Sequence, residues 1–269
     1  MTGLAIIGGG NLGGALARGW VQSGRWKAEE IHVTRRAFER LASLGGMGFR
    51  VGADNRKAVD ACDIVVLAVQ PQQIEALASE IAPILDATRP KIISVVSGVT
   101  FAQLDELFGP GLPMVRAMPN TAVEIGESMT CLSAGEHGED ALATATELFD
   151  LVGSTLVVAE RMMIPATALC ACGVAFFLRS VRAASQGGIE IGFHPEEALL
   201  LAAQTAKGAA ALLLEEGTHP EAEIDRVTTP RGCTIAGLNE MEHQGFSSAM
   251  IKGILLSARQ AEGLYQGQE

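Results

Sequence analysis

Short apolar runs alternate with amphipathic stretches through the first half of the chain. The runs predict strands over residues 4–7, 31–33, 64–69, 91–96 and 114–117. Because they are apolar almost throughout, and not at alternate positions only, both faces of the resulting sheet should be covered. The order therefore predicts βαβ units in a parallel, doubly wound α/β sheet of the Rossmann type.

The pattern changes after residue 158. Before it, two further predicted strands over 128–132 and 155–158 flank a predicted helix over 138–151. After it, apolar positions recur at helical spacing over 162–187 and 195–216, with turn residues at 192–195 and 217–220. We therefore predict a dinucleotide-binding Rossmann domain, residues 1–158, and an all-helical domain for substrate binding and oligomerisation, residues 159–269.

The predicted helix over 195–216 is unusually rich in alanine and leucine for a surface helix. Small residues let helices approach closely, and so much apolar surface favours burial against a second copy of the chain. We expect a homodimer or larger homo-oligomer formed through the C-terminal helices. The alternative is that the helical domain buries this surface within its own core.

The net charge and the lengths of the apolar runs exclude several classes of partner. The 269 residues have a formal net charge of −11, and no basic run extends beyond Arg35-Arg36, so nucleic acid is not an expected partner. The start lacks the basic region of a signal peptide, and no uncharged apolar stretch reaches about 18 residues. We expect a cytoplasmic protein without a membrane partner.

The 5 cysteines show no paired zinc-type spacing, and we interpret them as reduced thiols. Cys170 and Cys172 could chelate a metal, but no histidine close by in the sequence offers a third ligand. No metal site is predicted.

A glycine pattern follows the first predicted strand. The segment Gly8-Gly9-Gly10-Asn11-Leu12-Gly13 has G-x-G-x-x-G spacing and opens a predicted helix. In that context the first glycine allows the tight turn, the second lets a pyrophosphate approach the backbone, and the third lets helix and strand pack closely. The pattern predicts that Gly8, Gly10, Asn11, Leu12 and Gly13 bind a dinucleotide; the alternative is an ordinary turn.

The end of the second strand indicates which dinucleotide binds. An NAD site would have a carboxylate there, whereas this chain has Val33-Thr34-Arg35-Arg36. A guanidinium can pair with a 2′-phosphate, and the Thr34 hydroxyl can donate to it. Thr34 and Arg35 therefore favour NADP(H), with NAD(H) also accepted. The alternative is that the arginines are merely solvated.

Two loops follow the strands predicted at 64–69 and 91–96. One is Ala68-Val69-Gln70-Pro71 and the other Ser97-Gly98-Val99-Thr100. Ligands of such sheets bind at the carboxyl ends of the strands, so these loops outline a nicotinamide floor. Alternatively, their proline and glycine could serve only to form the turns between strand and helix.

The segment Arg116-Ala117-Met118-Pro119-Asn120-Thr121 resembles the RAMPNT segment of the pyrroline-5-carboxylate reductase family. The resemblance covers nearly the whole chain. It includes IIGGGNLG at 6–13, AVQP at 68–71, SVVSGVT at 94–100 and TTPRGCTIAGLNEMEHQGF at 228–246. It implies NADPH-dependent reduction of the cyclic imine 1-pyrroline-5-carboxylate to L-proline, the last step of proline biosynthesis.

The same resemblance implies further cofactor contacts. Asn55 would touch the cofactor ribose, and Met118, Pro119 and Asn120 would face the nicotinamide. Two alternatives stay open: Arg116 could be a buried ion-pair member, and Asn120 could cap a turn.

The segment Thr229-Pro230-Arg231-Gly232-Cys233-Thr234 is the candidate substrate site. Thr before Pro predicts an N-cap with Pro230 as the first helical residue, and the free amides of a helix start can hold a carboxylate. By resemblance, Thr234 is the catalytic candidate, whose hydroxyl bonds the imine nitrogen, while Arg231 adds a positive charge. The alternative is a helix cap with no ligand.

Several positions depart from the family pattern. Gln70 replaces Lys, Ala122 replaces Pro, and Arg231 and Cys233 interrupt the glycine-rich turn. Over 167–175 the family's Ser-Gly-Ser-Gly-Pro bend is mostly replaced by alanine, cysteine and valine, which predicts a straighter helix there.

Two other functions compete with imine reduction. A related dehydrogenase acting on a β-hydroxyacid would need a general acid or base, typically a lysine on the first long helix of the second domain, but no lysine occurs between Lys91 and Lys207. The second is a non-catalytic NADP-binding redox sensor.

Overall fold

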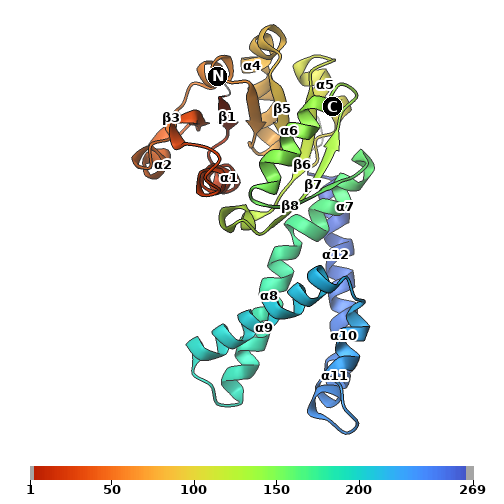
Figure 1. Ribbon diagram of the computed structural model, residues 1–269. Helices are drawn as coiled ribbons and strands as arrows, with labels where there is room; N and C mark the ends of the chain where they lie inside the picture. The colour runs from red at the N-terminus through yellow and green to blue at the C-terminus, as the bar shows by residue number, and fades with distance from the viewer. Residues whose placement is uncertain (1–2, 265–269) are drawn as a thin grey trace. The chain divides into compact units, whose positions relative to one another are not determined.

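Eight strands form one sheet in the computed structural model, which describes residues 3–264 (Figure 1). The strand order is β3-β2-β1-β4-β5-β6-β7-β8, and every neighbouring pair is parallel except β6 and β7. The strands are β1 (Leu4–Ile7), β2 (Ile31–Thr34), β3 (Arg50–Gly52), β4 (Ile64–Leu67), β5 (Lys91–Ser94), β6 (Met114–Met118), β7 (Ser128–Ala134) and β8 (Gly153–Val157). The predicted doubly wound α/β fold is confirmed.

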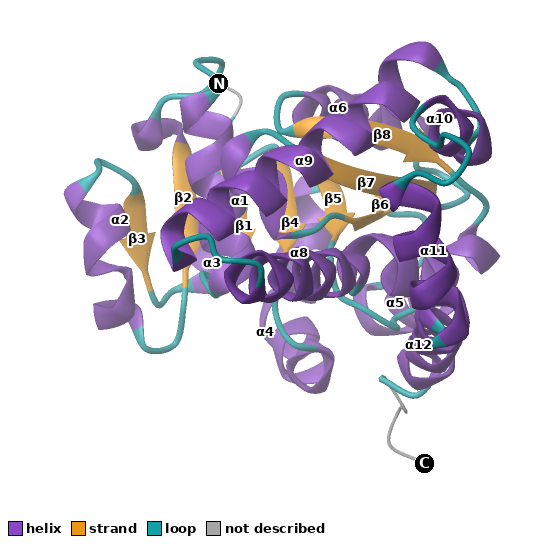
Figure 2. Ribbon diagram, turned by 90° about the horizontal axis from the view of Figure 1, so that it is seen from below, coloured by secondary structure: helices purple, strands orange, loops and turns teal. Residues whose placement is uncertain are grey.

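Helices cover both faces of the sheet (Figure 2). Leu4 and Ile6 of β1 share one apolar cluster with α1 (Asn11–Gln22) and α6 (Glu139–Asp150), whereas Ala5 and Ile7 share another with α3 (Asn55–Asp60), α4 (Ile74–Thr88) and α5 (Phe101–Phe108). Successive side chains of a strand point to opposite faces, so a strand buried on both sides must be apolar at every position.

The predicted boundaries differ from the observed ones mainly at strand ends. The runs predicted over 64–69 and 91–96 end as strands at Leu67 and Ser94, and their last residues form the loops beyond the sheet edge. β3 was not predicted, because it has three residues and begins with the exposed Arg50. The short helix η1 (Ala28–Glu30) precedes β2, and η2 (Phe38–Leu41) and α2 (Ala42–Gly46) lie between β2 and β3.

Beyond β8 the described chain is entirely helical, as predicted. The segments are η5 (Glu160–Met162), α7 (Met163–Ala166), η6 (Thr167–Ala171), α8 (Gly173–Glu190), α9 (Pro195–Glu216), α10 (Pro220–Arg226), α11 (Cys233–His243) and α12 (Phe246–Glu262). The straighter helix expected near residue 170 stays a prediction. At this position η6 is a π-helical turn, in which the Cys172 amide donates to the Thr167 carbonyl over 2.9 Å. Such bulges distort a helix without glycine or proline.

The described residues divide into two compact units. Residues 3–172 together with 257–264 form the first, and Gly173–Leu256 form the second. In the first unit, Met163 and Ala166 of α7 pack with Met118 and Cys131 of the sheet. The domain boundary predicted at residue 158 stays a prediction.

Within the second unit, α8 and α9 pack closely through small residues. A Cβ on Gly188 would lie 3.0 Å from the Cβ of Ala198, which is 2% exposed. The small side chains therefore let the two helix backbones approach.

The contact between α1 and η4 (Thr121–Ile125) provides a test of packing in the first unit. A Cβ on Gly19 would lie 2.3 Å from the Val123 carbonyl oxygen, so Gly19→Ala must displace backbone. We expect it to lower the free energy of unfolding by about 1–3 kcal/mol, measured by urea denaturation. Gly46→Ala, at an exposed position with open space around it, is the control and should change stability by about 0.5 kcal/mol or less. Equal effects of the two variants would contradict the packing described.

Candidate active site

The glycine loop between β1 and α1 is packed against the end of β4. Gly8 has φ +115°, and a Cβ there would lie 2.4 Å from the Ala68 carbonyl oxygen. A Cβ on Gly13 would lie 2.2 Å from the Gly8 carbonyl oxygen. These two positions therefore exclude any side chain, as the sequence pattern indicated.

Gly10 has a different environment. No heavy atom lies within 4 Å of a Cβ built on it, and it is the N-cap residue of α1. The first amides of a helix have no intrahelical acceptor and lie at the positive end of the helix dipole. The first turn of α1 contains no acidic residue that would occupy them. A dinucleotide pyrophosphate needs a close backbone approach at Gly10 and unpaired helix amides beside it, so Gly10 and the amides of Asn11, Leu12 and Gly13 fit the predicted cofactor.

The end of β2 holds the loop in place. The Gly8 and Gly9 amides both donate to the Thr34 carbonyl oxygen, at 3.1 and 2.7 Å. The Arg35 guanidinium is partly buried and donates to the Gly9 carbonyl oxygen over 3.1 Å, whereas Arg36 is exposed. Arg35 thus lies against the loop at the strand end where Rossmann folds distinguish the two dinucleotides.

Thr34 has a hydrogen-bond partner within the protein. Its side chain is fully buried, and the hydroxyl donates to Asn55 Oδ1 over 2.7 Å. The Asn55 side-chain amide in turn donates to Glu80 Oε2 over 2.9 Å. Thr34 and Glu80 therefore orient Asn55, and the predicted contact of the Thr34 hydroxyl with a phosphate stays a prediction.

The AVQP loop lies beside the glycine loop. Ala68 follows β4 directly, with its amide donating to Ile7, and its carbonyl oxygen is the close neighbour of Gly8. Gln70 is exposed and begins the short helix η3 (Pro71–Gln73). The structure thus brings Ala68, the start of this loop, against the glycine loop.

At the end of β6, Met118 and Pro119 are buried and Asn120 is partly exposed. The Asn120 side-chain oxygen accepts from the Ala122 amide over 2.9 Å, which caps η4, and its nitrogen donates to the Cys170 carbonyl oxygen over 3.3 Å. Asn120 therefore caps a turn and also holds the π-helical turn η6 against the sheet.

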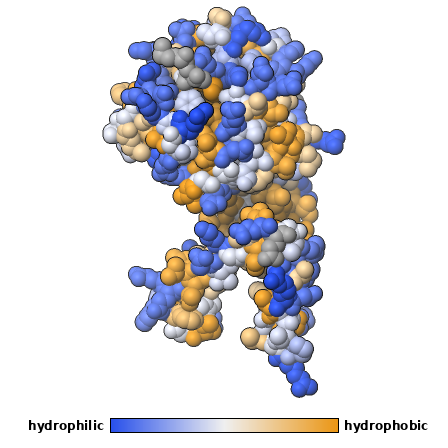
Figure 3. Space-filling view, in the orientation of Figure 1, coloured by the Kyte–Doolittle hydropathy of each residue, from blue (hydrophilic) through white to orange (hydrophobic). Residues whose placement is uncertain are grey.

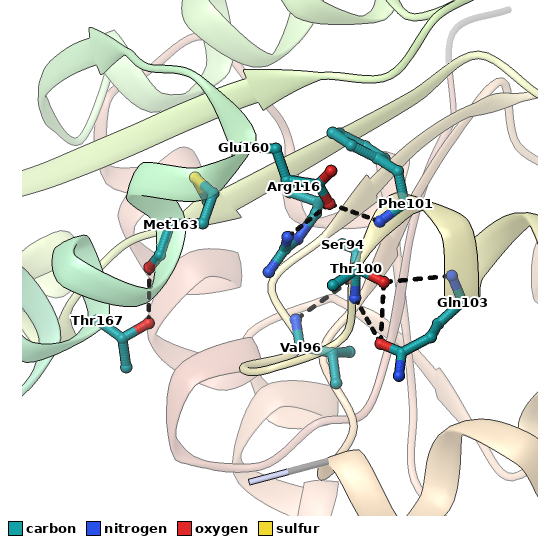
Figure 4. Close-up of polar contacts among 9 residues, drawn as sticks. All are labelled: Ser94, Val96, Thr100, Phe101, Gln103, Arg116, Glu160, Met163 and Thr167. Atoms are coloured by element: carbon teal, nitrogen blue, oxygen red, sulfur yellow. Dashed lines mark hydrogen bonds and ion pairs between the residues drawn. The ribbon is translucent and has the colours of Figure 1, made fainter. Parts of the chain in front are cut away.

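The buried Arg116 forms an ion pair with the partly exposed Glu160 (Figure 4). It is 3% exposed, and its guanidinium lies 2.8 Å from Glu160 Oε1 and over the ring of Phe101. The same carboxylate oxygen accepts from the Phe101 amide over 2.6 Å. Burial lowers the pKa of Arg116, opposed by the hydrogen bond and charge of Glu160. Arg116 therefore links β6 with α5 and η5. This agrees with the alternative interpretation from the sequence, in which Arg116 is a member of an ion pair.

The turn before α11 differs from its prediction. The helix begins at Cys233 with Gly232 as N-cap, so the predicted N-cap at Thr229 and first helical residue at Pro230 are wrong. The Gly232 amide donates to the Thr229 carbonyl oxygen over 2.9 Å, and Arg231 has φ +61°. Pro followed by a residue with positive φ makes a type II turn, which prevents the helix from starting earlier.

The amides free at this helix start are consequently those of Cys233, Thr234 and the next residue. Thr234 is partly buried, and Arg231 and Cys233 are exposed. The predicted cofactor residues all lie in the first compact unit, and Thr229–Thr234 lie in the second.

Two acidic residues of this region were not predicted. Glu80 and Glu160 are separated from their partners by 25 and 44 positions, and neither belongs to a local motif. Their pairing becomes visible only in the fold. Among residues 3–264, no group of three histidine, cysteine or acidic side chains is placed to hold a metal ion.

Two family models match the chain. Residues 3–98 match NADP oxidoreductase coenzyme F420-dependent, and residues 160–264 match Pyrroline-5-carboxylate reductase dimerisation. The first covers the glycine loop, Arg35 and the AVQP loop, and the second covers the helical segments.

Similar curated proteins include two from Dictyostelium discoideum. Pyrroline-5-carboxylate reductase 1 is 48% identical over 98% of this chain, which spans 50% of that protein's length. Pyrroline-5-carboxylate reductase 2 is 45% identical over 96% of this chain and 91% of its own length.

Two solved structures share the fold. A pyrroline-5-carboxylate reductase from Coxiella burnetii has a TM-score of 0.88 with 29% identity, covering 99% of both chains. A Plasmodium falciparum pyrroline carboxylate reductase with NADP bound has a TM-score of 0.90 with 22% identity, covering 98% of both. Because a relative 45% identical matches along most of both sequences, the chain belongs to the pyrroline-5-carboxylate reductase family.

Proposed function

We propose that this chain reduces 1-pyrroline-5-carboxylate to L-proline with NADPH, and that it accepts NADH less well. The observation on which the proposal depends is the open space around Gly10, the N-cap residue of α1, in a chain whose relatives are named pyrroline-5-carboxylate reductases. Arg35, held against the same loop, supports the preference for the phosphorylated dinucleotide.

The chain's own residues mainly bind and orient. When bound, the cofactor supplies the hydride, and protonation of the imine nitrogen makes the imine carbon electrophilic enough to accept it. The amides of Asn11, Leu12 and Gly13 would bind the pyrophosphate, Asn55 the ribose, and Arg35 the 2′-phosphate. Met118, Pro119 and Asn120 would line the nicotinamide side, with the exposed Gln70 and Pro71 at its edge.

The start of α11 supplies the substrate residues in this proposal. Its free amides at Cys233 and Thr234 would hold the carboxylate, with the exposed Arg231 adding positive charge. The Thr234 hydroxyl would donate to the imine nitrogen and help to supply its proton. Thr229, Pro230 and Gly232 shape the turn that presents these groups.

The β-hydroxyacid alternative is not supported by the helices. The first long helical segment after the sheet, residues 163–190, contains no lysine to serve as its general acid or base. The redox-sensor alternative remains an outcome of the assay below.

The helical segments present extensive apolar surface, some of which Figure 3 shows in orange. Exposed apolar side chains include Phe177, Leu178, Leu199, Leu200 and Leu214. By length and composition, Glu160–Glu190 and Pro195–Glu215 could each cross a membrane. Both lie inside the residues that match the dimerisation model, so we propose that a second copy of the chain covers this surface.

A cytoplasmic location remains a proposal. All 5 cysteines are free thiols, which suits a reducing compartment. Recovery of the protein in a secreted or membrane fraction would contradict it.

A single assay tests the function. When 1-pyrroline-5-carboxylate is added to the purified protein with NADPH, we expect the absorbance of the reduced nicotinamide to fall and proline to form. A β-hydroxyacid added with NADP should give no change in absorbance. Light scattering on the same sample should show a dimer or larger assembly. Tight NADPH binding without turnover would favour the redox sensor, and a monomer would contradict the proposed covering of α8 and α9.

Arg35→Ala tests the cofactor preference. Loss of a charged hydrogen bond to the 2′-phosphate should weaken NADPH binding by about 10- to 100-fold and leave NADH binding nearly unchanged. Arg36→Ala, one residue further along and exposed, is the matched control and should change neither. Both affinities can be measured by nicotinamide fluorescence titration, and an unchanged ratio for Arg35→Ala would show that the side chain does not contact the 2′-phosphate.

Thr234→Ala tests the substrate hydroxyl. We expect turnover to fall by about 10- to 100-fold with NADPH affinity unchanged, because the lost hydrogen bond belongs to the imine and not to the cofactor. Thr228→Ala is the control, since that hydroxyl donates to the Ile224 carbonyl oxygen over 2.7 Å within its own helical turn. Parallel loss of turnover and NADPH binding in Thr234→Ala would reject the assigned role.

A further inference from the structure

Two cysteines face each other beside the candidate nicotinamide residues. Cys131 belongs to β7, and Cys170 belongs to the π-helical turn η6, 39 positions later. Their Sγ atoms lie 3.9 Å apart. The proposed reduction uses neither thiol.

The surroundings of the two sulfur atoms suit a bond between them. A disulfide has an S–S distance of about 2.05 Å, so the atoms must approach by about 1.9 Å. Cys131 is 5% exposed and fixed within the sheet, whereas Cys170 is partly exposed on a turn with non-standard helix hydrogen bonding. We propose that Cys131 and Cys170 form a reversible intramolecular disulfide when the protein meets a peroxide.

The environment gives the two thiols different roles. Either thiol can donate to the other, and a hydrogen bond from Cys131 lowers the pKa of Cys170 to about 7. The hydrogen bond with Cys170 and burial raise the pKa of Cys131. Cys170, which is also the more exposed, is therefore the thiolate that a peroxide meets, and Cys131 is the resolving thiol.

The reaction balances with one peroxide per disulfide. The Cys170 thiolate attacks one peroxide oxygen, the O–O bond breaks, and the released hydroxide takes a proton to become water. The Cys131 sulfur then attacks the Cys170 sulfenic sulfur, the S–O bond breaks, and the leaving hydroxide takes the Cys131 proton. Two thiols are oxidised to a disulfide, and one peroxide is reduced to two waters.

The bond would act on the proposed active site. Met118 is directly opposite Cys131 in the β6–β7 ladder, and the Asn120 side chain donates to the Cys170 carbonyl oxygen. Drawing Cys170 toward β7 moves the carbonyl that Asn120 holds. This effect on activity rests on the proposed function, whereas formation of the bond does not.

Mass spectrometry after peroxide treatment tests the proposal on the intact protein. Trypsin cleaves after Arg116, Arg161 and Arg179, so Cys131 lies in the fragment 117–161 and Cys170 in 162–179. We expect hydrogen peroxide to join these two fragments with the loss of two hydrogen atoms, and dithiothreitol to release them.

Cys172 provides the matched control, because it lies in the same fragment, two residues from Cys170, and is also partly exposed. The link should disappear in Cys170→Ala and persist in Cys172→Ala. In the untreated protein, alkylation of Cys170 should rise with a midpoint near pH 7. A link through Cys172, a link between two chains, or sulfinic acid at Cys170 without a link would each overturn the proposal.

An activity measurement on the same samples separates the two claims. Oxidised protein should lose most NADPH-dependent imine reduction and regain it with dithiothreitol, and Cys170→Ala should be insensitive to peroxide. If reduced protein shows no turnover at all, the proposed function fails, while the mass measurement still decides whether the disulfide forms.

Discussion

The approach of three backbone segments around the glycine loop is the constraint on which the candidate site depends. Gly8, Gly13 and Ala68 come so close that a single methyl group at either glycine would collide with a carbonyl oxygen. Since β1, α1 and β4 meet there, the position of the first α1 amides is fixed by backbone packing. The loop therefore holds these amides in the position that the proposed pyrophosphate contact requires.

Much of this arrangement could be predicted, because it depends on local chemistry. The buried strands are apolar at every position, and the G-x-G-x-x-G spacing indicates both the tight turn and the helix that follows. β3 gave no such pattern, since three residues with an exposed arginine look like a loop. The sequence therefore indicated where the cofactor loop lies better than where the sheet ends.

Other features depend on contacts that local sequence does not contain. Glu80 and Glu160 pair with residues far away in the chain, so neither pairing could be inferred from spacing. At Thr229-Pro230 the helix-start signal was outweighed by a type II turn, whose positive φ falls on an arginine and not on a glycine. The π-helical turn at Thr167–Ala171 likewise contains no glycine or proline, so its sequence did not indicate a distorted helix.

The left-handed backbone at Arg231 has a consequence for how this turn is maintained. A residue with a Cβ costs roughly 1–2 kcal/mol in this conformation relative to the right-handed region, a penalty that glycine avoids. Arg231 nevertheless adopts it, with its side chain at an exposed turn. Replacement of Arg231 by glycine would relax the backbone, but it would also remove the only lysine or arginine between Arg226 and Lys252. In the proposed substrate site, stability and attraction of the carboxylate therefore place opposing demands on this position.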